Sequence, residues 1–266
     1  MKLNFLQKPK RNMNIFFKVG VVFFVCHLTN LHAQTKKDSI KTTDISRTNP
    51  GILNNSLTLS NEYKILDDNS FYKNTFKVIN EFILDKNGKT LFRLSTPFLA
   101  TNLPENKNGL GNLNVRFAYV THKTKKYAGA IYADFDLNTT TERSLRTNKN
   151  DFEFGYTQAF YFKNNDIFAV AYLQSLSLTN SGPNLNTNQG SFDFYYVKSF
   201  NSNKQTIKGD FSFVADYANK FNYSSFKIIF VQKITDNIVA SINPSIGIGA
   251  SRDHNYSLGF GLSHVF

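Results

Sequence analysis

From Ile52 to the end of the chain, apolar and polar residues alternate in segments of about ten residues, separated by short polar breaks. A period of two is typical of a β-strand with one apolar and one polar face, because successive side chains point to opposite sides. With the breaks taken at clusters of Asn, Asp, Gly, Lys and Pro, we expect twelve strands. They are predicted near residues 54–65, 74–84, 89–98, 111–121, 127–137, 151–163, 167–178, 190–200, 205–217, 223–234, 237–250 and 255–266.

The two faces of these segments differ in chemistry. One face collects aromatic and branched side chains, such as Phe154 and Phe194, and the other collects charges. The chain contains 27 Phe and 13 Tyr, and an inward-facing apolar lining could not hold so many rings, because small barrels are already filled at eight strands. An arrangement with rings facing outward and charges facing inward suits a lipid bilayer. There every backbone group must be paired, so the sheet must close.

The connections between the expected strands alternate in length. Tight connections such as 85–89 and 201–204 follow the even-numbered strands, whereas the longest, 99–110 and 138–150, follow odd-numbered ones. Short periplasmic turns and longer extracellular loops are typical of bacterial outer-membrane barrels. The predicted fold class is therefore all-β: a closed antiparallel transmembrane β-barrel of about 12 strands. We expect it in the outer membrane of a Gram-negative cell, surrounded by outer-membrane lipid.

The first part of the chain resembles a targeting segment. Five basic residues and no acid precede and flank the apolar run that ends near Leu28, and Ala33 suits a cleavage site. We therefore expect a signal peptide at 1–33, cleaved on export, a polar periplasmic tail at 34–51, and the barrel at 52–266. Met13 is an alternative start. Cys26 is the only cysteine, so the mature chain is expected to have none.

The last segment, "YSLGFGLSHVF" from Tyr256 to Phe266, alternates up to a final aromatic residue. It resembles the carboxy-terminal recognition strand of outer-membrane proteins, which the barrel-insertion machinery reads. The resemblance implies that this machinery is a partner of the chain, through Tyr256 to Phe266.

A second resemblance covers residues 90–120, "TLFRLSTPFLATNLPENKNGLGNLNVRFAYV". An Arg-bearing strand with a proline near its end, a loop, and then "GLGNLNVRFAY" are similar to the phenol meta-pathway transporter-like family of outer-membrane channels. The resemblance implies passive uptake or efflux of a small, aromatic or apolar solute.

Charged residues on the polar face are the candidate lumen, or solute path. Glu81, Arg93, Arg116 and Asp134 lie on four successive strands, with the two bases between the two acids, so they could orient a passing solute. The alternative is that the same groups pair and close a narrow barrel. The candidate residues are Glu81, Arg93, Arg116, Asp134, Asp136, Glu153, Asp193, Asp210 and Lys227.

Other functions find less support in the sequence. The net charge of +12 falls to +7 without the five basic residues of residues 1–33, and no strand carries a basic run interleaved with aromatics, so no nucleic-acid partner is expected. A lipid hydrolase would need a base, and His254 beside Asp253 and Ser251 is the candidate at the outer rim, although neighbours in a turn rarely have triad geometry. We expect no catalysis, cofactor or metal; a structural or adhesive barrel without an open pore stays open as an alternative.

Overall fold

A computed structural model describes residues 49–66, 71–102, 106–140, 150–162, 166–178, 187–201 and 203–266. The predicted signal peptide and nearly all of the predicted tail lie outside these residues. No helix in the described part is long and apolar enough to cross a membrane.

The described chain is built from β-strands, as the alternation predicts. They are β1 (Ser56–Ile65), β2 (Tyr72–Ile83), β3 (Thr90–Thr101), β4 (Lys107–Leu110), β5 (Leu113–Lys123), β6 (Tyr127–Leu137), β7 (Asp151–Tyr161), β8 (Ile167–Ser177), β9 (Asn188–Phe200), β10 (Gln205–Asp216), β11 (Phe221–Lys233), β12 (Ile238–Ile248) and β13 (Tyr256–Val265).

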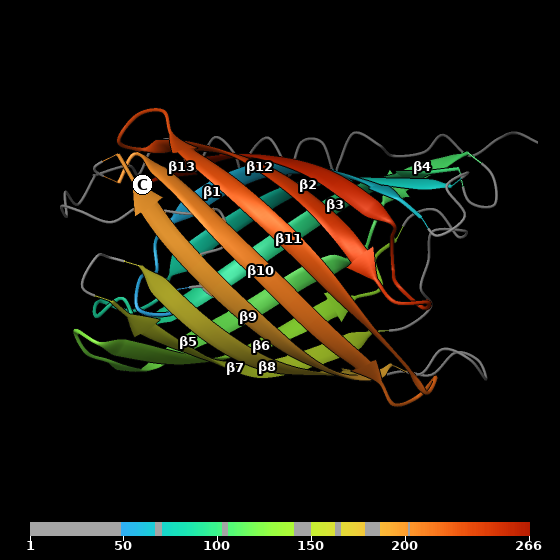
Figure 1. Cartoon of the computed structure of the whole chain (residues 1–266), viewed down its shortest axis with the longest axis horizontal. Helices are drawn as coiled ribbons and strands as arrows, with labels where there is room; N and C mark the ends of the chain where they lie inside the picture. The colour runs from blue at the N-terminus through green and yellow to red at the C-terminus, as the bar shows by residue number, and fades with distance from the viewer. Residues whose placement is uncertain are drawn as a thin grey trace, which may run out of the picture. The chain divides into compact units, whose positions relative to one another are not determined.

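Twelve of these strands form one closed antiparallel ring, with β4 as a short addition. Neighbours in the sequence are neighbours in the ring, and β1 pairs with β13 over its full length, from Ser56 opposite Val265 to Ile65 opposite Tyr256. Figure 1 shows strands of the near wall, in orange and red, crossing the green strands of the far wall, as strands tilted to a barrel axis do. The predicted twelve-strand closed barrel is confirmed.

One expected loop is largely strand. The sequence predicts a loop over 99–110, but β3 continues to Thr101 and β4 pairs with its upper part, Phe98 opposite Leu110. The register then shifts by one residue, so that Ser95 faces Asn114 of β5. At the shift the amide of Gly111 donates to the carbonyl of Pro97 at 2.8 Å. β4 and β5 therefore form one long strand with a bulge. The sequence pattern did not indicate β4, because a bulge breaks the period of two.

The faces of the sheet are as the sequence predicts. Side chains such as Phe154, Phe194 and Phe260 are exposed on the outer face, whereas Arg116, Asp134 and their neighbours are buried on the inner face. An outer face of this kind can be stable in hydrocarbon, since each of the twelve strands of the ring has two hydrogen-bonded neighbours.

The two ends of the barrel differ. We call "turn end" the end of the short connections 84–89, 124–126 and 234–237, where β1 also begins, and "loop end" the opposite one. Exposed lysines gather at the turn end: Lys86, Lys89, Lys125, Lys126 and Lys204.

We expect the replacement of Phe194 by Arg to lower the free energy of unfolding by about 2–4 kcal/mol, because position 194 faces outward at mid-strand, where an arginine meets the centre of the bilayer. Phe200→Arg, at the turn end of the same strand, should cost about 0–1 kcal/mol. Urea unfolding in lipid vesicles measures both. Equal costs at the two positions would contradict a lipid-facing outer surface.

Candidate functional site

A cavity of about 610 Å³ lies inside the ring. Its walls are mainly polar, and all but a few of the strands contribute to it. We call it the chamber. It is lined by Thr58, Ser60, Lys77, Ile79, Arg93, Ser95, Pro97, Asn112, Asn114, Arg116, Asp134, Asp136, Asp151, Glu153, Ser175, Thr187, Gln189, Lys227, Ile229, Ser241, Asn243 and Gly261.

The inner face changes character along some of the strands. On β6, Ala128 and Ala130 lie at the turn end, Tyr132 follows, and Asp134 and Asp136 then line the chamber. On β8 three inward positions, 169, 171 and 173, precede Ser175 of the chamber. On this side of the ring the lumen is apolar toward the turn end, which we call the apolar half, and polar beyond it.

The apolar half is packed. Its buried cluster comprises Leu91, Ala118, Tyr132, Ala159, Ala169, Ala171, Leu173 and Tyr195. These residues share the inward parity of the charged ones, so their positions could have been derived from the alternation. The lumen residues predicted from the sequence are nevertheless all charged.

A buried ion pair marks the boundary between the halves. Nε and Nη2 of Arg116 donate to the two carboxylate oxygens of Asp134, each at 2.6 Å. The guanidinium also lies 5.4 Å from the ring centre of Tyr132, which belongs to the apolar cluster. Arg116 is only 2% exposed, so this bidentate pair is fixed in place and acts as part of the wall.

The charges of the chamber balance and are separated by sign. Lys77, Arg93 and Lys227 lie on β2, β3 and β11, on one side of the ring. The acids lie on the opposite side: Asp136 on β6, and Asp151 and Glu153 on β7. These two strands face β12 and β13, which lie between β11 and β2 in the ring. With the paired Arg116 and Asp134 included, the lining holds four bases and four acids.

Hydrogen bonds fix the acidic wall. Asp136 accepts from the amide of Asn114 at 2.8 Å, and Glu153 accepts from the hydroxyl of Ser175 at 3.0 Å. On the basic side, Arg93 reaches Asn114 at 3.3 Å and Asp134 at 3.9 Å.

Polar groups without protein partners also face the chamber. Lys77 and Lys227 form no hydrogen bond or close ion pair with any residue that the structure describes, although the carboxylate of Glu62 on β1 attracts both. The hydroxyl of Ser241 and the amide oxygen of Asn243 are buried and without a hydrogen bond in the same part of the chain. Buried polar groups normally have hydrogen-bond partners, so this side of the chamber has unused hydrogen-bonding capacity.

The predicted lumen residues divide into two groups. Six of them line the chamber: Arg93, Arg116, Asp134, Asp136, Glu153 and Lys227. Three do not. Glu81 accepts from Ser56 near the turn end at 2.8 Å, Asp193 accepts from Tyr195 at 3.1 Å, and Asp210 lies 3.8 Å from Lys208. Lys77 and Asp151 complete the charged lining, and neither is among the lumen residues predicted from the sequence.

Residues 49–55, which precede β1, cross the turn end of the lumen, and we call them the strap. The hydroxyl of Tyr161 donates to the side chain of Asn49 at 2.6 Å, and Lys123 donates to the carbonyl of Gly51. Pro50 is fully buried, and Leu53 packs against the apolar cluster. Tyr161 lies on β7, across the ring from β1, so the strap spans the lumen.

A hydrogen-bonded chain of side chains lies at the loop end, near β12 and β13. Nε2 of His254 lies 2.9 Å from the hydroxyl of Ser245, and Nδ1 contacts Asp253. Serine, histidine and aspartate contact one another in the order found in a catalytic triad, which is unusual for neighbours in a turn. The serine is Ser245, whereas the sequence suggested Ser251. The hydroxyl of Ser245 is buried, also bonds Ser257 at 2.6 Å and does not line the chamber, so the chain of contacts anchors the connection 249–255.

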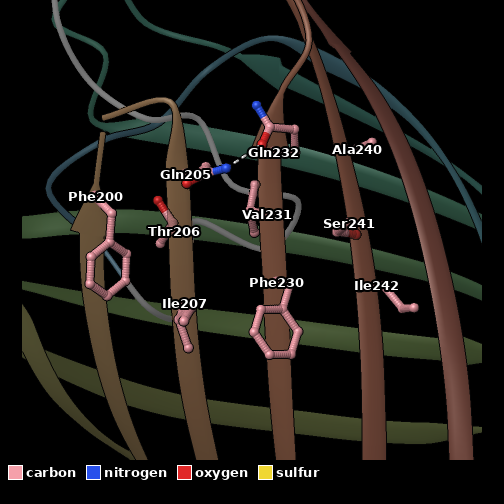
Figure 2. A pocket seen from close by; sticks show the side chains of 10 residues that line it. All are labelled: Phe200, Gln205, Thr206, Ile207, Phe230, Val231, Gln232, Ala240, Ser241 and Ile242. Carbon is pink, nitrogen blue, oxygen red and sulfur yellow. Dashed lines mark hydrogen bonds between the residues drawn. The ribbon is translucent and has the colours of Figure 1, made fainter. Parts of the chain in front are cut away.

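A second hollow, of about 420 Å³, lies on the outer face between β9 and β12. Figure 2 shows Phe200, Ile207, Phe230 and Ile242 along it, with Gln205 bonded to Gln232 at 3.0 Å near its rim. The four apolar side chains are exposed on the outer face. This groove therefore faces the surroundings of the barrel, and the chamber is the better candidate for a solute site.

The geometry defines a transmembrane β-barrel of the outer-membrane type with a partly filled lumen. No protein-family model matches the sequence, and no curated protein matches it. Among solved structures, the chain is similar to the COG4313 outer membrane channel from Pseudomonas putida F1, with a TM-score of 0.72 and 7% identity over 86% of this chain and 100% of that one.

Two porins are similar at a lower level. The KdgM porin, solved in complex with disordered oligogalacturonate, has a TM-score of 0.55 and 11% identity over 79% of this chain and 99% of its own. The NanC porin has a TM-score of 0.55 and 12% identity over 80% and 98%. At these identities the likeness concerns the fold.

Replacing Gly51 by Val should free the strap from the wall, because a Cβ at position 51 would overlap the hydroxyl of Tyr161. Overpacking of this kind costs about 1–3 kcal/mol, so the open population should rise by about tenfold. The readout is the rate of maleimide labelling at Leu53→Cys, in a chain with Cys26 replaced by Ser.

Gly209→Val is the matched control, since a Cβ there has no neighbour closer than 4.0 Å. Unchanged labelling in the Gly51 variant would contradict the packing of the strap against Tyr161.

We expect Asp253 to stabilise the barrel in a pH-dependent way. Burial alone would raise its pKa, but the hydrogen bond from His254 and the charge of Lys64 outweigh burial and hold the pKa well below its usual range. Because the pKa is lower in the folded chain than in the unfolded one, the stabilisation is complete above about pH 4 and is lost as the pH falls further.

Urea unfolding as a function of pH should therefore show a smaller acid-induced loss for Asp253→Asn than for the original chain. Asp236→Asn, which removes an exposed pair with Lys233, should change the profile less. Labelling of Ser245 by a fluorophosphonate would contradict the structural role of its contacts.

Proposed function

We propose that the chain is an outer-membrane channel that lets a small solute cross passively. One observation carries the proposal: a chamber of about 610 Å³, lined by four bases and four acids, inside a closed ring with an apolar outer face. Buried charges are costly to desolvate, and Lys77 and Lys227 have no close ion pair in the described chain to offset that cost.

The comparisons support the same reading. The similar structures include one described as an outer membrane channel and two described as porins. Membership of the phenol meta-pathway transporter-like family, placement in a Gram-negative outer membrane after cleavage of residues 1–33, and insertion through Tyr256 to Phe266 are further parts of the proposal. The turn end would then face the periplasm.

One observation favours the alternative of a barrel without an open pore. The apolar cluster and the strap fill the turn-end half of the lumen. The cluster consists of strand side chains, whereas the strap precedes β1 and is tied to the opposite wall by two hydrogen bonds, from Tyr161 and Lys123. The strap is thus the part of the filling that can leave while the ring stays intact.

Single-channel recording of refolded protein in a planar bilayer tests the proposal. We expect reproducible current steps with weak preference between cations and anions, because the charges of the chamber cancel. Lys227→Glu should shift the reversal potential toward cation preference, whereas Lys86→Glu at the turn end should shift it less.

Arg116 suits this experiment poorly, since its replacement leaves the buried Asp134 without its bidentate partner. A silent bilayer for both the original chain and Gly51→Val would favour the closed barrel over the channel.

A further inference from the structure

One stretch of the chamber wall carries serine side chains on both sides of a glycine. Ser60 on β1 lies directly opposite Gly261 on β13, and Gly261 lies directly opposite Ser241 on β12. All three residues line the chamber, so the cavity reaches the backbone of the glycine between the two serines. We call this part of the wall, Ser60, Gly261 and Ser241, the slot.

The backbone does not account for the glycine in the slot. In the described chain the glycines with a positive φ are Gly88 and Gly249, so the conformation at Gly261 does not require glycine. β13 also keeps an unbroken register with both of its neighbours at this point, so there is no bulge in its pairing. A glycine inside a regular strand is often found where another group approaches the backbone closely.

The polar groups at the slot have no hydrogen-bond partner in the part of the chain that the structure describes. Ser241 is 8% exposed and its hydroxyl is unbonded, and the hydroxyl of Ser60 is unbonded as well. Asn243 is the next inward residue of β12, and its Nδ2 lies 3.3 Å from the place that a Cβ at Gly259 would take. The amide oxygen of Asn243 is buried and also unbonded.

The groups around the slot include both donors and acceptors. A serine hydroxyl can donate and accept, the amide oxygen of Asn243 can only accept, and an ammonium group can only donate. Lys77 lies opposite Ser60 in the neighbouring strand pair, and the carboxylate of Glu62 attracts it. A carboxylate of a solute would leave the amide oxygen without a donor, and an ammonium group would be repelled by the lysine. A solute hydroxyl can pair with every one of these groups.

The width of the slot suits a ring that carries hydroxyls. Ser60 and Ser241 lie two strands apart, so their backbones are separated by roughly 10 Å. Two hydrogen bonds of about 2.8 Å leave about 4–5 Å between the two bonded oxygens of a solute, which is close to the separation of hydroxyls across a sugar ring. The rest of the chamber is compatible with such a solute, because ten of its lining residues carry neutral hydroxyl or amide side chains.

We propose that the slot binds a small neutral solute of the monosaccharide class, with its ring over Gly261 and its hydroxyls bonded to Ser60, Ser241 and Asn243. This inference rests on the proposed channel function and names its class of solute. It differs from the aromatic or apolar solute that the family resemblance implies, because none of the described residues that line the chamber is aromatic and only three are apolar.

The first test compares D-glucose with glucuronate and glucosamine, which keep the sugar ring and add a negative or a positive charge. Calorimetry on the refolded barrel, in a detergent without a sugar head group, measures binding without requiring conduction. We expect glucose to bind about fivefold more tightly than either charged sugar, the effect of one hydrogen bond. Equal or tighter binding of a charged sugar would overturn the inference.

The second test removes one hydroxyl. Ser241→Ala should weaken the binding of glucose about fivefold, while urea unfolding of the empty barrel stays unchanged, because that hydroxyl has no partner to lose. Ser224→Ala is the matched control, since Ser224 lies opposite Phe213 on the outer face of the sheet, and it should keep the affinity. Lower stability with unchanged affinity in the Ser241 variant would show a structural role and overturn the inference.

The third test fills the slot. Gly261→Val should weaken the binding of glucose by more than tenfold, because the valine side chain takes the place of the sugar ring. Gly209→Val is the matched control, since a Cβ there has no neighbour closer than 4.0 Å. Circular dichroism shows whether both variants are folded, and Ser60→Ala, with an expected fivefold loss of affinity, replaces Gly261→Val if that variant does not fold. Unchanged affinity in a folded slot variant would overturn the inference.

Uptake into proteoliposomes separates this inference from the channel proposal. Entry of glucose, glucuronate and glucosamine at one rate, with no selective binding, would leave a channel but remove the sugar site. Selective binding of glucose with no entry of any solute would keep the site and contradict the channel.

Discussion

The hydrogen bonds of the backbone govern this structure. Each strand of the ring has a paired neighbour on both sides, and the seam from Ser56 opposite Val265 to Ile65 opposite Tyr256 removes the last two edges. In hydrocarbon an unpaired amide or carbonyl costs several kcal/mol, so only a closed sheet can present an outer face of Phe and Ile side chains to lipid. Closure in turn creates an enclosed interior. Twelve strands enclose more volume than their inward side chains can fill along the whole length of the barrel.

The interior meets this excess volume in two ways. Toward the turn end, small wall residues such as Ala159 and Ala169 make room for Tyr132, Leu173 and the strap, and the space is packed. Toward the loop end the space is left as a chamber and lined with charges. Arg116 joins the two regimes, because its guanidinium pairs with Asp134 and lies over the ring of Tyr132. The lumen is therefore neither a uniform pore nor a uniform core.

Much of this architecture follows from the period of two. It predicted twelve strands, their faces, and six of the nine lumen residues now found in the chamber lining. It did not predict β4, because the bulge at Gly111 shifts the parity. It also did not predict the contact of Ser245 with His254, because His254 lies in the connection after β12, whose path the alternation does not encode. The strap escaped as well: residues 49–51 have no periodicity, and only the closed ring brings Asn49 to Tyr161.

The lysines at the turn end have a consequence for how the protein responds to ionic strength. Lys86, Lys125 and Lys204 are exposed, so dissolved salt screens them over a distance of about 8–10 Å under ordinary conditions. The side chains of the chamber are enclosed by the wall and are screened far less. The concentration of electrolyte thus acts mainly on the rim of the barrel and leaves enclosed pairs such as Arg116 with Asp134 nearly unscreened.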